Sequence, residues 1–274
     1  MPSSTAKAGN LRRRFPAFAV EDGTAGLYED RAGFVRPEQT VLEHLRRAAA
    51  AGADLRHDER VLEWSADDGG EGVTVRTATG VHRAASLVVS AGAWAPRLLP
   101  QLAPHLTVER QLLFWFAPTT SIAAFRAPAQ PVYVWEHGPQ LQIYGFPAHG
   151  PEDGGVKVAF FRNGRRTDPD QLDRAVTPDE VARMRDHLAL RMPTLAGTHL
   201  RSVACMYTTT PDEHFVISLH PEHPQVAVAA GFSGHGFKFV PLVGEVLADL
   251  VTERATAHPI DLFSPARLTA TAAR

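Results

Sequence analysis

The chain has 274 residues, 44% of them hydrophobic, which is enough for one large domain or two interleaved ones with a buried core. Its formal net charge of −2 excludes a general electrostatic attraction to nucleic acid or to an anionic membrane. Cys205 is the single cysteine, which excludes an internal disulfide, and no apolar run reaches the roughly 18 residues of a membrane helix. We therefore expect a cytoplasmic protein that binds neither nucleic acid nor membrane.

The first third of the chain predicts one helix followed by strands. Residues 1–10 are small and polar, and we expect them to be frayed. A helix is predicted over 38–51, with Gly52 as its C-terminal stop. Strands are expected at 61–64, 73–77, 81–84 and 87–90, with turns such as 67–70 between them. The last of these strands is apolar and ends in the small-residue turn 91–94, where α/β sheets bind ligands.

The middle of the chain predicts an antiparallel sheet. Its strands are expected at 108–117, 132–136, 141–145 and 156–161, joined by hairpins such as the one at 138–139. A helix over 179–192 follows, with Pro178 well placed at its first turn. Strands at 200–207, which carries Cys205, and at 215–218 lead back to α/β patterning. The layout predicts an α/β fold in which two domains are interleaved.

Residues 226–251 form the most informative segment. An apolar strand at 226–230 is followed by a turn in which Gly231, Gly234 and Gly236 allow positive φ. A helix over 240–251 comes next. This arrangement points free N–H groups and a positive dipole end at one spot, so it suits an anion or a ring that becomes anionic in a reaction. Lys238 adds a cation where the helix begins.

Three interpretations of this segment remain open on residues alone. It is an ordinary βα turn in a core, a nucleophile elbow around Ser233, or a cofactor turn. A separate alternative takes His214, His220, His223 and His235 as metal ligands, although 220–223 lies in a proline-broken loop. The glycine turn that could contact a ligand is present at 231–236. The G-x-G-x-x-G motif that binds the diphosphate of a dinucleotide does not occur in the chain.

Several motifs resemble one known family. They are Arg14-Phe-Pro16, Gly33 with Pro37-Glu38, Ala91-Gly-Ala-Trp94, Tyr144-Gly-Phe-Pro147, Cys205-Met-Tyr-Thr208 with Pro211-Asp-Glu-His-Phe215, and Gly231-Phe-Ser-Gly-His-Gly-Phe-Lys238. The last two, taken together, are specific. From about residue 15 to residue 263 the chain resembles the monomeric sarcosine oxidase and N-methyl-L-tryptophan oxidase family of flavoproteins.

The resemblance implies an FAD-dependent enzyme that oxidises a secondary amino acid, such as sarcosine or N-methyl-tryptophan, and reduces O₂ to H₂O₂. It implies a covalent bond between the flavin and Cys205, whose alternative role is that of a buried apolar filler. Lys157 would promote the reaction with O₂, and Lys238 would hold the substrate carboxylate. Tyr144 and Tyr207 would line the substrate pocket. Further flavin contacts are implied for Val61, Gly92, Trp94, Gly231, Gly234, His235, Gly236, Phe237 and Lys238.

The chain departs from the family pattern in two ways. Phe161 stands where the family has a histidine near the substrate, which puts the substrate scope in question. The resemblance also begins well inside the family's length, so we expect an N-terminally truncated member, impaired unless a complementing N-terminal chain is present. The competing interpretation is an inactive fragment that binds no flavin.

The resemblance also implies a division of the chain into parts. Residues 1–34 would be a lead-in on the substrate-domain side, and 35–99 a partial FAD-binding Rossmann-like domain that lacks the G-x-G-x-x-G half. Residues 100–207 would form the antiparallel or mixed-sheet substrate domain, and 208–274 the returning FAD-binding segment. The expected partners are a small N-methyl amino acid and O₂, and the protein is expected to be a monomer or to pair with the complementing chain.

Overall fold

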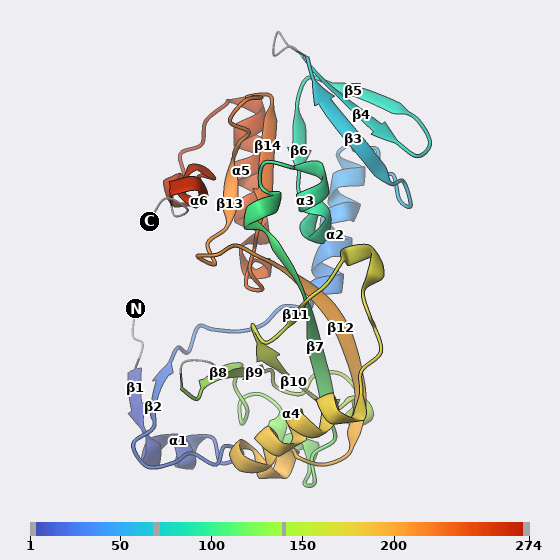
Figure 1. Cartoon of the computed structure of the whole chain (residues 1–274). Helices are drawn as coiled ribbons and strands as arrows, with labels where there is room; N and C mark the ends of the chain where they lie inside the picture. The colour runs from blue at the N-terminus through green and yellow to red at the C-terminus, as the bar shows by residue number, and fades with distance from the viewer. Residues whose placement is uncertain (1–3, 68–71, 139–140, 271–274) are drawn as a thin grey trace. The chain divides into compact units, whose positions relative to one another are not determined.

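The computed structural model describes residues 4–67, 72–138 and 141–270. The chain divides into two compact units, each assembled from separate stretches (Figure 1). The first unit comprises residues 1–35, 110–165 and 172–205, and the second unit comprises 36–109, 166–171 and 206–274. Two long strands, β7 (Thr107–Phe116) and β12 (His199–Thr209), contribute residues to both units.

The second unit contains two three-stranded sheets. One is antiparallel, in the order β3 (Val61–Ala66), β4 (Val73–Thr77), β5 (Val81–Ala84). The other has the order β13 (Val216–Leu219), β14 (Val226–Ala230), β6 (Leu87–Val89), with β6 parallel to β14. The helices are α2 (Pro37–Ala50), α3 (Ala95–Leu98), α5 (Val240–Thr252) and α6 (Ala266–Ala270).

Strand β14 is apolar throughout because both of its faces are covered. Side chains alternate along a strand, so Val226, Val228 and Ala230 point to one side and Ala227 and Ala229 to the other. The first set packs in a cluster with Ala95, Leu99, Leu102 and Leu106. The second set packs with Val246, Leu247 and Leu250 of α5, which runs along β13 and β14 in Figure 1. This two-sided core fixes the strand from which the glycine turn leaves.

The first unit is built on a six-stranded sheet. Its order is β11 (Arg165–Arg166), β7, β10 (Val156–Phe161), β9 (Gln142–Gly145), β8 (Tyr133–Glu136), and β12 also pairs with β7. The pairs β7–β10, β10–β9 and β9–β8 are antiparallel. A small sheet of β1 (Ser4–Lys7) and β2 (Ala25–Tyr28) and the helices α1 (Ala8–Arg14) and α4 (Pro178–Arg191) complete the unit.

One face of the large sheet is packed against α4. Met184 and Leu188 of the helix share a core cluster with Phe114, Val158 and Phe160 of the sheet. Since neighbours in a strand point to opposite faces, Trp115, Lys157 and Phe161 emerge on the other face. The α4 helix begins at the predicted place: Thr177 and Glu180 form a reciprocal capping box, and Pro178 occupies the first turn.

The structure confirms the predicted α/β class and most of the predicted elements, but it corrects the N-terminus. Residues expected to be frayed form β1 and the start of α1, and β2 was not predicted. The predicted helix over 38–51 ends as expected, because Gly52 has a φ of +96°, but no residue of α2 is buried. Strand β6 is only partly buried, with Val88 38% exposed. The predicted turns at 67–70 and 138–139 extend outside the described residues. No helix in the described part of the chain has the length and apolar character needed to cross a membrane.

Candidate active site

The glycine turn of the second unit leaves the buried end of β14. Gly231 and Gly234 have φ values of +64° and +78°, as predicted, and Ser233 between them has +49°. Gly236 does not need positive φ, since its φ is −77°. A Cβ at Gly236 would instead collide with the side chain of Phe232, so close packing and not backbone conformation requires glycine there.

Tyr207 and the glycine turn pack against each other. A Cβ at Gly234 would collide with the ring of Tyr207, and a Cβ at Gly231 would lie 2.5 Å from the methyl group of Thr210. Ser233 N donates a hydrogen bond to Thr208 O at 2.9 Å, which ties the turn to β12. Two predicted site residues of the second unit, Tyr207 and Gly234, are therefore in direct contact.

Ser233 is a structural residue of this turn. It is fully buried, its Oγ donates to Gly231 O at 3.0 Å, and the same Oγ accepts from Thr210 N at 3.3 Å. Nδ1 of His235 lies 3.1 Å from Ser233 O and not from the hydroxyl, and the His235 ring packs 4.8 Å from that of Phe215. The nucleophile elbow is excluded, because Ser233 Oγ is fully buried and, among the described residues, its hydrogen bonds go to Gly231 and Thr210 and not to a base.

The turn runs into a short 3₁₀ helix, Phe237–Phe239, and then into α5. The first residue of α5 is Val240, Pro241 occupies its first turn, and no side chain caps its N-terminus. Lys238 is exposed, and its Nζ lies 5.9 Å from the centre of the Phe239 ring. The second unit thus presents a cation at the start of a helix whose dipole also favours an anion.

Trp94 and Gly92 lie in a second turn of the same unit, after β6. Gly92 has a φ of +53°, and Trp94 is 40% exposed. The indole Nε1 of Trp94 donates to Asp170 Oδ1 at 2.7 Å, and Arg97 forms an ion pair with the same carboxylate. The hydrogen bond from Trp94, followed by the bond from Arg97, lowers the pKa of Asp170 to about 2. Val61, at the start of β3, is 39% exposed.

Lys157 lies on the face of the large sheet that is turned away from α4, which we call the open face of the first unit. It is opposite Trp115 in the β7–β10 register, inside the sheet and not on an edge strand. Its Nζ lies 5.0 Å from the centre of the Phe146 ring and 5.6 Å from that of Trp115. Arg201 lies over the same Trp115 ring, at 3.6 Å. The sequence interpretation missed this aromatic wall, although alternation along β7 and β10 would have placed Trp115 on the face of Lys157.

Cys205 is a free, half-buried thiol. Burial raises its pKa, and the positive charge of Lys157 acts in the opposite direction. Alternation along β12 puts Cys205 on the same face of the strand as Arg201, which lies over the Trp115 ring beside Lys157, so two residues singled out from the sequence lie on one face of the sheet.

Tyr144 and Phe161 extend this open face. Tyr144 is opposite Ala159 in the β9–β10 register, and its ring centre lies 6.1 Å from that of Phe161 and 5.9 Å from that of Phe146. The guanidinium carbon of Arg162 lies 4.5 Å from the centre of the Phe161 ring. The open face is thus an aromatic surface that carries an ammonium group and a thiol.

The four histidines of the metal alternative do not come together. Ligand atoms of His220, Glu222 and His223 lie within 4.8 Å of one another, whereas His214 and His235 are not in that group. The ring nitrogens of His220 already have partners. Its Nδ1 accepts from Glu222 N at 3.2 Å, and its Nε2 lies 2.6 Å from the amide of Gln101.

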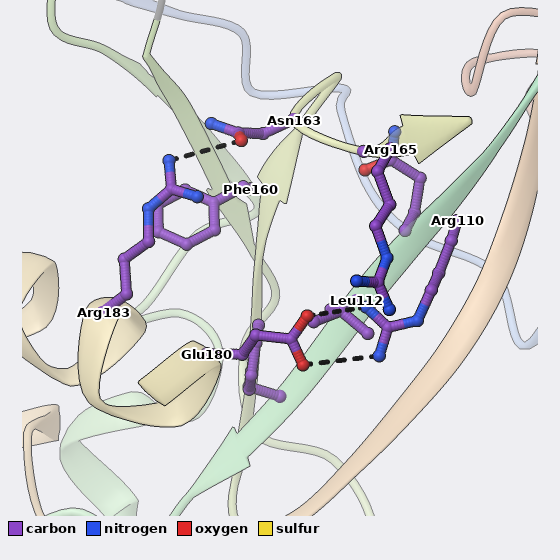
Figure 2. A pocket seen from close by; sticks show the side chains of 10 residues that line it. Arg110, Leu112, Phe160, Asn163, Arg165, Glu180 and Arg183 are labelled. Atoms are coloured by element: carbon purple, nitrogen blue, oxygen red, sulfur yellow. Dashed lines mark hydrogen bonds and ion pairs between the residues drawn. The ribbon is translucent and has the colours of Figure 1, made fainter. Parts of the chain in front are cut away.

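A hollow of about 310 Å³ on the other side of the first unit is organised by an internal ion pair (Figure 2). Arg110 is buried and donates to Glu180 Oε1 at 2.7 Å, to Asp173 O and to Ala175 O. Arg183 lies over Phe160 and donates to Asn163 Oδ1 at 3.3 Å. The buried guanidinium is satisfied by protein acceptors, so this hollow is not the candidate site.

Comparisons with known proteins show the family of the chain. The family described as FAD dependent oxidoreductase matches residues 3–250. The monomeric sarcosine oxidase of Streptomyces avermitilis is 47% identical over 271 residues, which are 98% of this chain and 70% of that protein. The N-methyl-L-tryptophan oxidase of Salmonella dublin is 32% identical over 260 residues, 94% of this chain and 67% of that protein.

Solved structures are also similar to this chain. The structure of NikD, described as an unusual amino acid oxidase essential for nikkomycin biosynthesis, superposes with a TM-score of 0.78 at 25% identity, over 96% of this chain and 68% of that one. The first curated relatives are matched over 65% to 70% of their own length.

Proposed function

Because this chain belongs to the FAD dependent oxidoreductase family, we propose that it carries the flavin-contacting turn and the substrate-facing sheet of an oxidase acting on the CH–NH bond of a small N-methylated amino acid. The observation that carries the proposal is the open face of the first unit. There the ammonium group of Lys157 and the thiol of Cys205, the single cysteine of the sequence, lie on one face of the sheet with aromatic side chains.

Each unit contains residues that fit the reactive end of FAD. The second unit offers the glycine turn, the uncapped start of α5 and exposed Trp94 and Phe237. The first unit offers Cys205, which we propose bonds covalently to the flavin, and Lys157. When bound, FAD would supply the hydride acceptor for the substrate and the route by which the electrons reach O₂. By this proposal residues 35–99 and 208–274 belong to the FAD-binding part, and 100–207 with the lead-in 1–34 to the substrate part.

The chain's own residues then have distinct tasks. Lys157 holds a fixed positive charge in an aromatic environment, where it stabilises the negative charge that develops when O₂ is reduced. Lys238 provides an exposed cation for the substrate carboxylate at the start of α5. Tyr144 and Tyr207 supply hydroxyl groups that orient the substrate, and Phe161 makes the neighbouring surface apolar.

We further propose that the polypeptide 1–274 holds FAD weakly by itself. None of its 274 residues belongs to a G-x-G-x-x-G motif, so it lacks that seat for the diphosphate. Hydrogen bonds to charged groups contribute about 1.5–3 kcal/mol each, and micromolar affinity corresponds to only about 8 kcal/mol. Losing even three such bonds therefore removes most of a micromolar binding energy.

The experiment compares the chain alone with the chain co-expressed with the segment of the Streptomyces relative that it does not match. We expect the complemented protein to be yellow, to keep flavin after acid precipitation, and to make H₂O₂ from an N-methyl amino acid. A complemented, folded protein that is colourless and makes no H₂O₂ would reject the oxidase in favour of an inactive fragment. Stoichiometric FAD and full turnover in the chain alone would reject the weak-binding part.

A further inference from the structure

The loop 210–215 joins β12 to β13 in the second unit. It contacts both the glycine turn and the C-terminal residues 263–267. The helix α6 is anchored in the core of the same unit, because Leu268 is buried and belongs to the cluster that contains residues of β14. The loop therefore connects a well-anchored C-terminal helix to the turn for which we propose flavin contacts.

Arg267 of α6 binds this loop with a bidentate ion pair. Its Nε donates to Asp212 Oδ2 at 2.7 Å, and its Nη2 donates to Asp212 Oδ1 at 3.2 Å. The same Nη2 donates to His214 O at 2.7 Å. The side chains of the pair are only 17% and 35% exposed, so water screens the pair less than it would on the surface. A bidentate guanidinium–carboxylate pair fixes direction as well as distance, so Arg267 holds the loop in one position.

Thr210 ties the same loop to the glycine turn. Its Oγ1 donates to His214 O at 2.7 Å, which is also an acceptor of Arg267. Its backbone N donates to Ser233 Oγ at 3.3 Å, and that hydroxyl donates to Gly231 O at 3.0 Å. Thr210 and Ser233 are buried, so water does not compete for these bonds. A continuous series of hydrogen bonds therefore leads from Arg267 to the turn.

Aromatic rings form a second connection through the last residue of the loop. The ring of Phe215 lies 4.9 Å from that of Phe232 and 4.8 Å from that of His235, both in the glycine turn. It also stacks on Phe263 of the C-terminal segment, at 5.5 Å between ring centres. Phe215 is buried, so a shift of the loop would move its ring against both neighbours in the turn.

The backbone of the loop needs this support. Glu213 has a φ of +62°, and its N donates to Thr210 O at 3.1 Å. A residue other than glycine keeps such a conformation only where its surroundings hold it. Arg267 binds the residues on both sides of Glu213, namely Asp212 and His214. Loss of the guanidinium should therefore loosen the loop, and the turn with it.

We propose that Arg267 is a positioning residue, which acts through Asp212 and Thr210 to fix the glycine turn where it contacts the flavin. The flavin contact itself rests on the proposed function. Arg267 does not touch flavin or substrate by this proposal, and its effect on the reaction is indirect. Because reacting groups must be held in a narrow geometry, a small shift of the turn should slow the reaction.

The first test measures hydrogen–deuterium exchange in the chain 1–274 without FAD. Arg267→Met should speed exchange of the amides at 231–236 roughly tenfold, because it removes the charge-assisted bonds that hold the loop. Exchange in β4 should stay unchanged. The matched control is Arg76→Met, which breaks the ion pair with Glu63 in the same unit and should leave the turn unaffected.

Thr210→Val covers the case in which Arg267→Met does not fold. Valine keeps the shape of threonine and removes the hydroxyl that donates to His214 O, so exchange at 231–236 should rise here as well. Unchanged exchange in the turn in the folded variants would overturn the proposal. An equal rise in the turn and in β4 would also overturn it, because it would show a general loss of stability.

The second test uses the FAD-loaded, complemented protein. Arg267→Met should change the visible circular dichroism of the bound flavin, since the flat ring acquires this signal from its asymmetric surroundings, and should lower kcat roughly tenfold. Arg76→Met should alter neither. An unchanged flavin signal in Arg267→Met would overturn the proposal. A complemented protein without flavin would reject the proposed function, and the exchange result separates that failure from a failure of Arg267 to position the turn.

Discussion

The ring of Tyr207 fills the space that a side chain at Gly234 would occupy. Gly234 also has a φ of +78°, so any other residue there would be strained in its backbone as well as in its packing. The glycine turn and the Tyr207 ring are therefore packed together in the second unit. A substitution at Gly234 should displace the Tyr207 ring, and a substitution at Tyr207 should alter the packing of the turn.

The first prediction is that Gly234→Ala destabilises the protein by about 1–3 kcal/mol and displaces Tyr207. Urea unfolding followed by circular dichroism measures the loss. The matched control is Gly244→Ala in α5, where an added Cβ meets no atom within 4 Å. Helix propensity should make that control neutral or more stable by roughly 0.5–1 kcal/mol. Equal effects of the two substitutions would contradict the contact between Gly234 and Tyr207.

The second prediction concerns Lys157 in the FAD-loaded, complemented protein. Lys157→Met should slow reoxidation of the flavin by O₂ on the order of 10²-fold while slowing its reduction by substrate much less. The reason is the loss of a fixed cation beside Trp115 and Phe146. Stopped-flow absorbance separates the two half-reactions, and Lys7→Met in β1 is the control. An unchanged oxidative half-reaction in Lys157→Met would refute the assigned role.

The third prediction concerns the reactivity of Cys205. Burial raises its thiol pKa, so the thiolate fraction at neutral pH should be lower in the folded chain than in the unfolded chain. Because the charge of Lys157 lowers this pKa, Lys157→Met should raise it further and slow alkylation by iodoacetamide. Mass spectrometry across pH follows the reaction without ambiguity, since the chain has one cysteine. Faster alkylation in Lys157→Met would show that the two groups do not interact.

The same residue provides a test of covalent attachment. In the complemented protein, flavin fluorescence should stay with the denatured polypeptide on a gel, and Cys205→Ser should release it. Flavin that washes off the unsubstituted protein in acid would rule out the bond.

The fourth prediction is a preference for a bulky N-methyl amino acid over sarcosine. Phe161 and Tyr144 place two rings 6.1 Å apart on the open face, and an apolar side chain gains from contact with them. The ratio of kcat/KM for N-methyl-L-tryptophan to that for sarcosine measures the preference. Phe161→His should shift this ratio toward sarcosine. A clear preference of the unsubstituted protein for sarcosine would reject the idea.

The fifth prediction uses the Asp170 carboxylate. Its folded-state pKa is lowered to about 2, first by the hydrogen bond from Trp94 and then by that from Arg97, against about 3.9 in an unfolded chain. A lowered folded pKa means that the stabilising contribution is present above about pH 4 and is lost as pH falls toward 2. Trp94→Phe removes the indole N–H and should raise this pKa, as NMR titration of the Asp170 carboxyl would show. A titration midpoint unchanged in Trp94→Phe would contradict the hydrogen bond.

The sequence by itself determined the elements whose signals are local. The capping residues Thr177 and Glu180 and Pro178 start α4 at the expected place, and Gly52 ends α2. The continuous apolar run 226–230 predicted a strand, and the structure covers both faces of that strand. The motifs around Cys205 and Gly231 indicated the family.

The tertiary structure alone decided which distant residues meet, because contacts across a sheet depend on register and not on local propensity. The β7–β10 register places Trp115 beside Lys157, and the packing of the glycine turn against β12 places Tyr207 against Gly234. Gly236 needed the structure as well, since its glycine is required by the Phe232 side chain and not by its own φ. The N-terminal strand β1 was missed because its stability comes from pairing with β2, which no short-range pattern in residues 4–7 records.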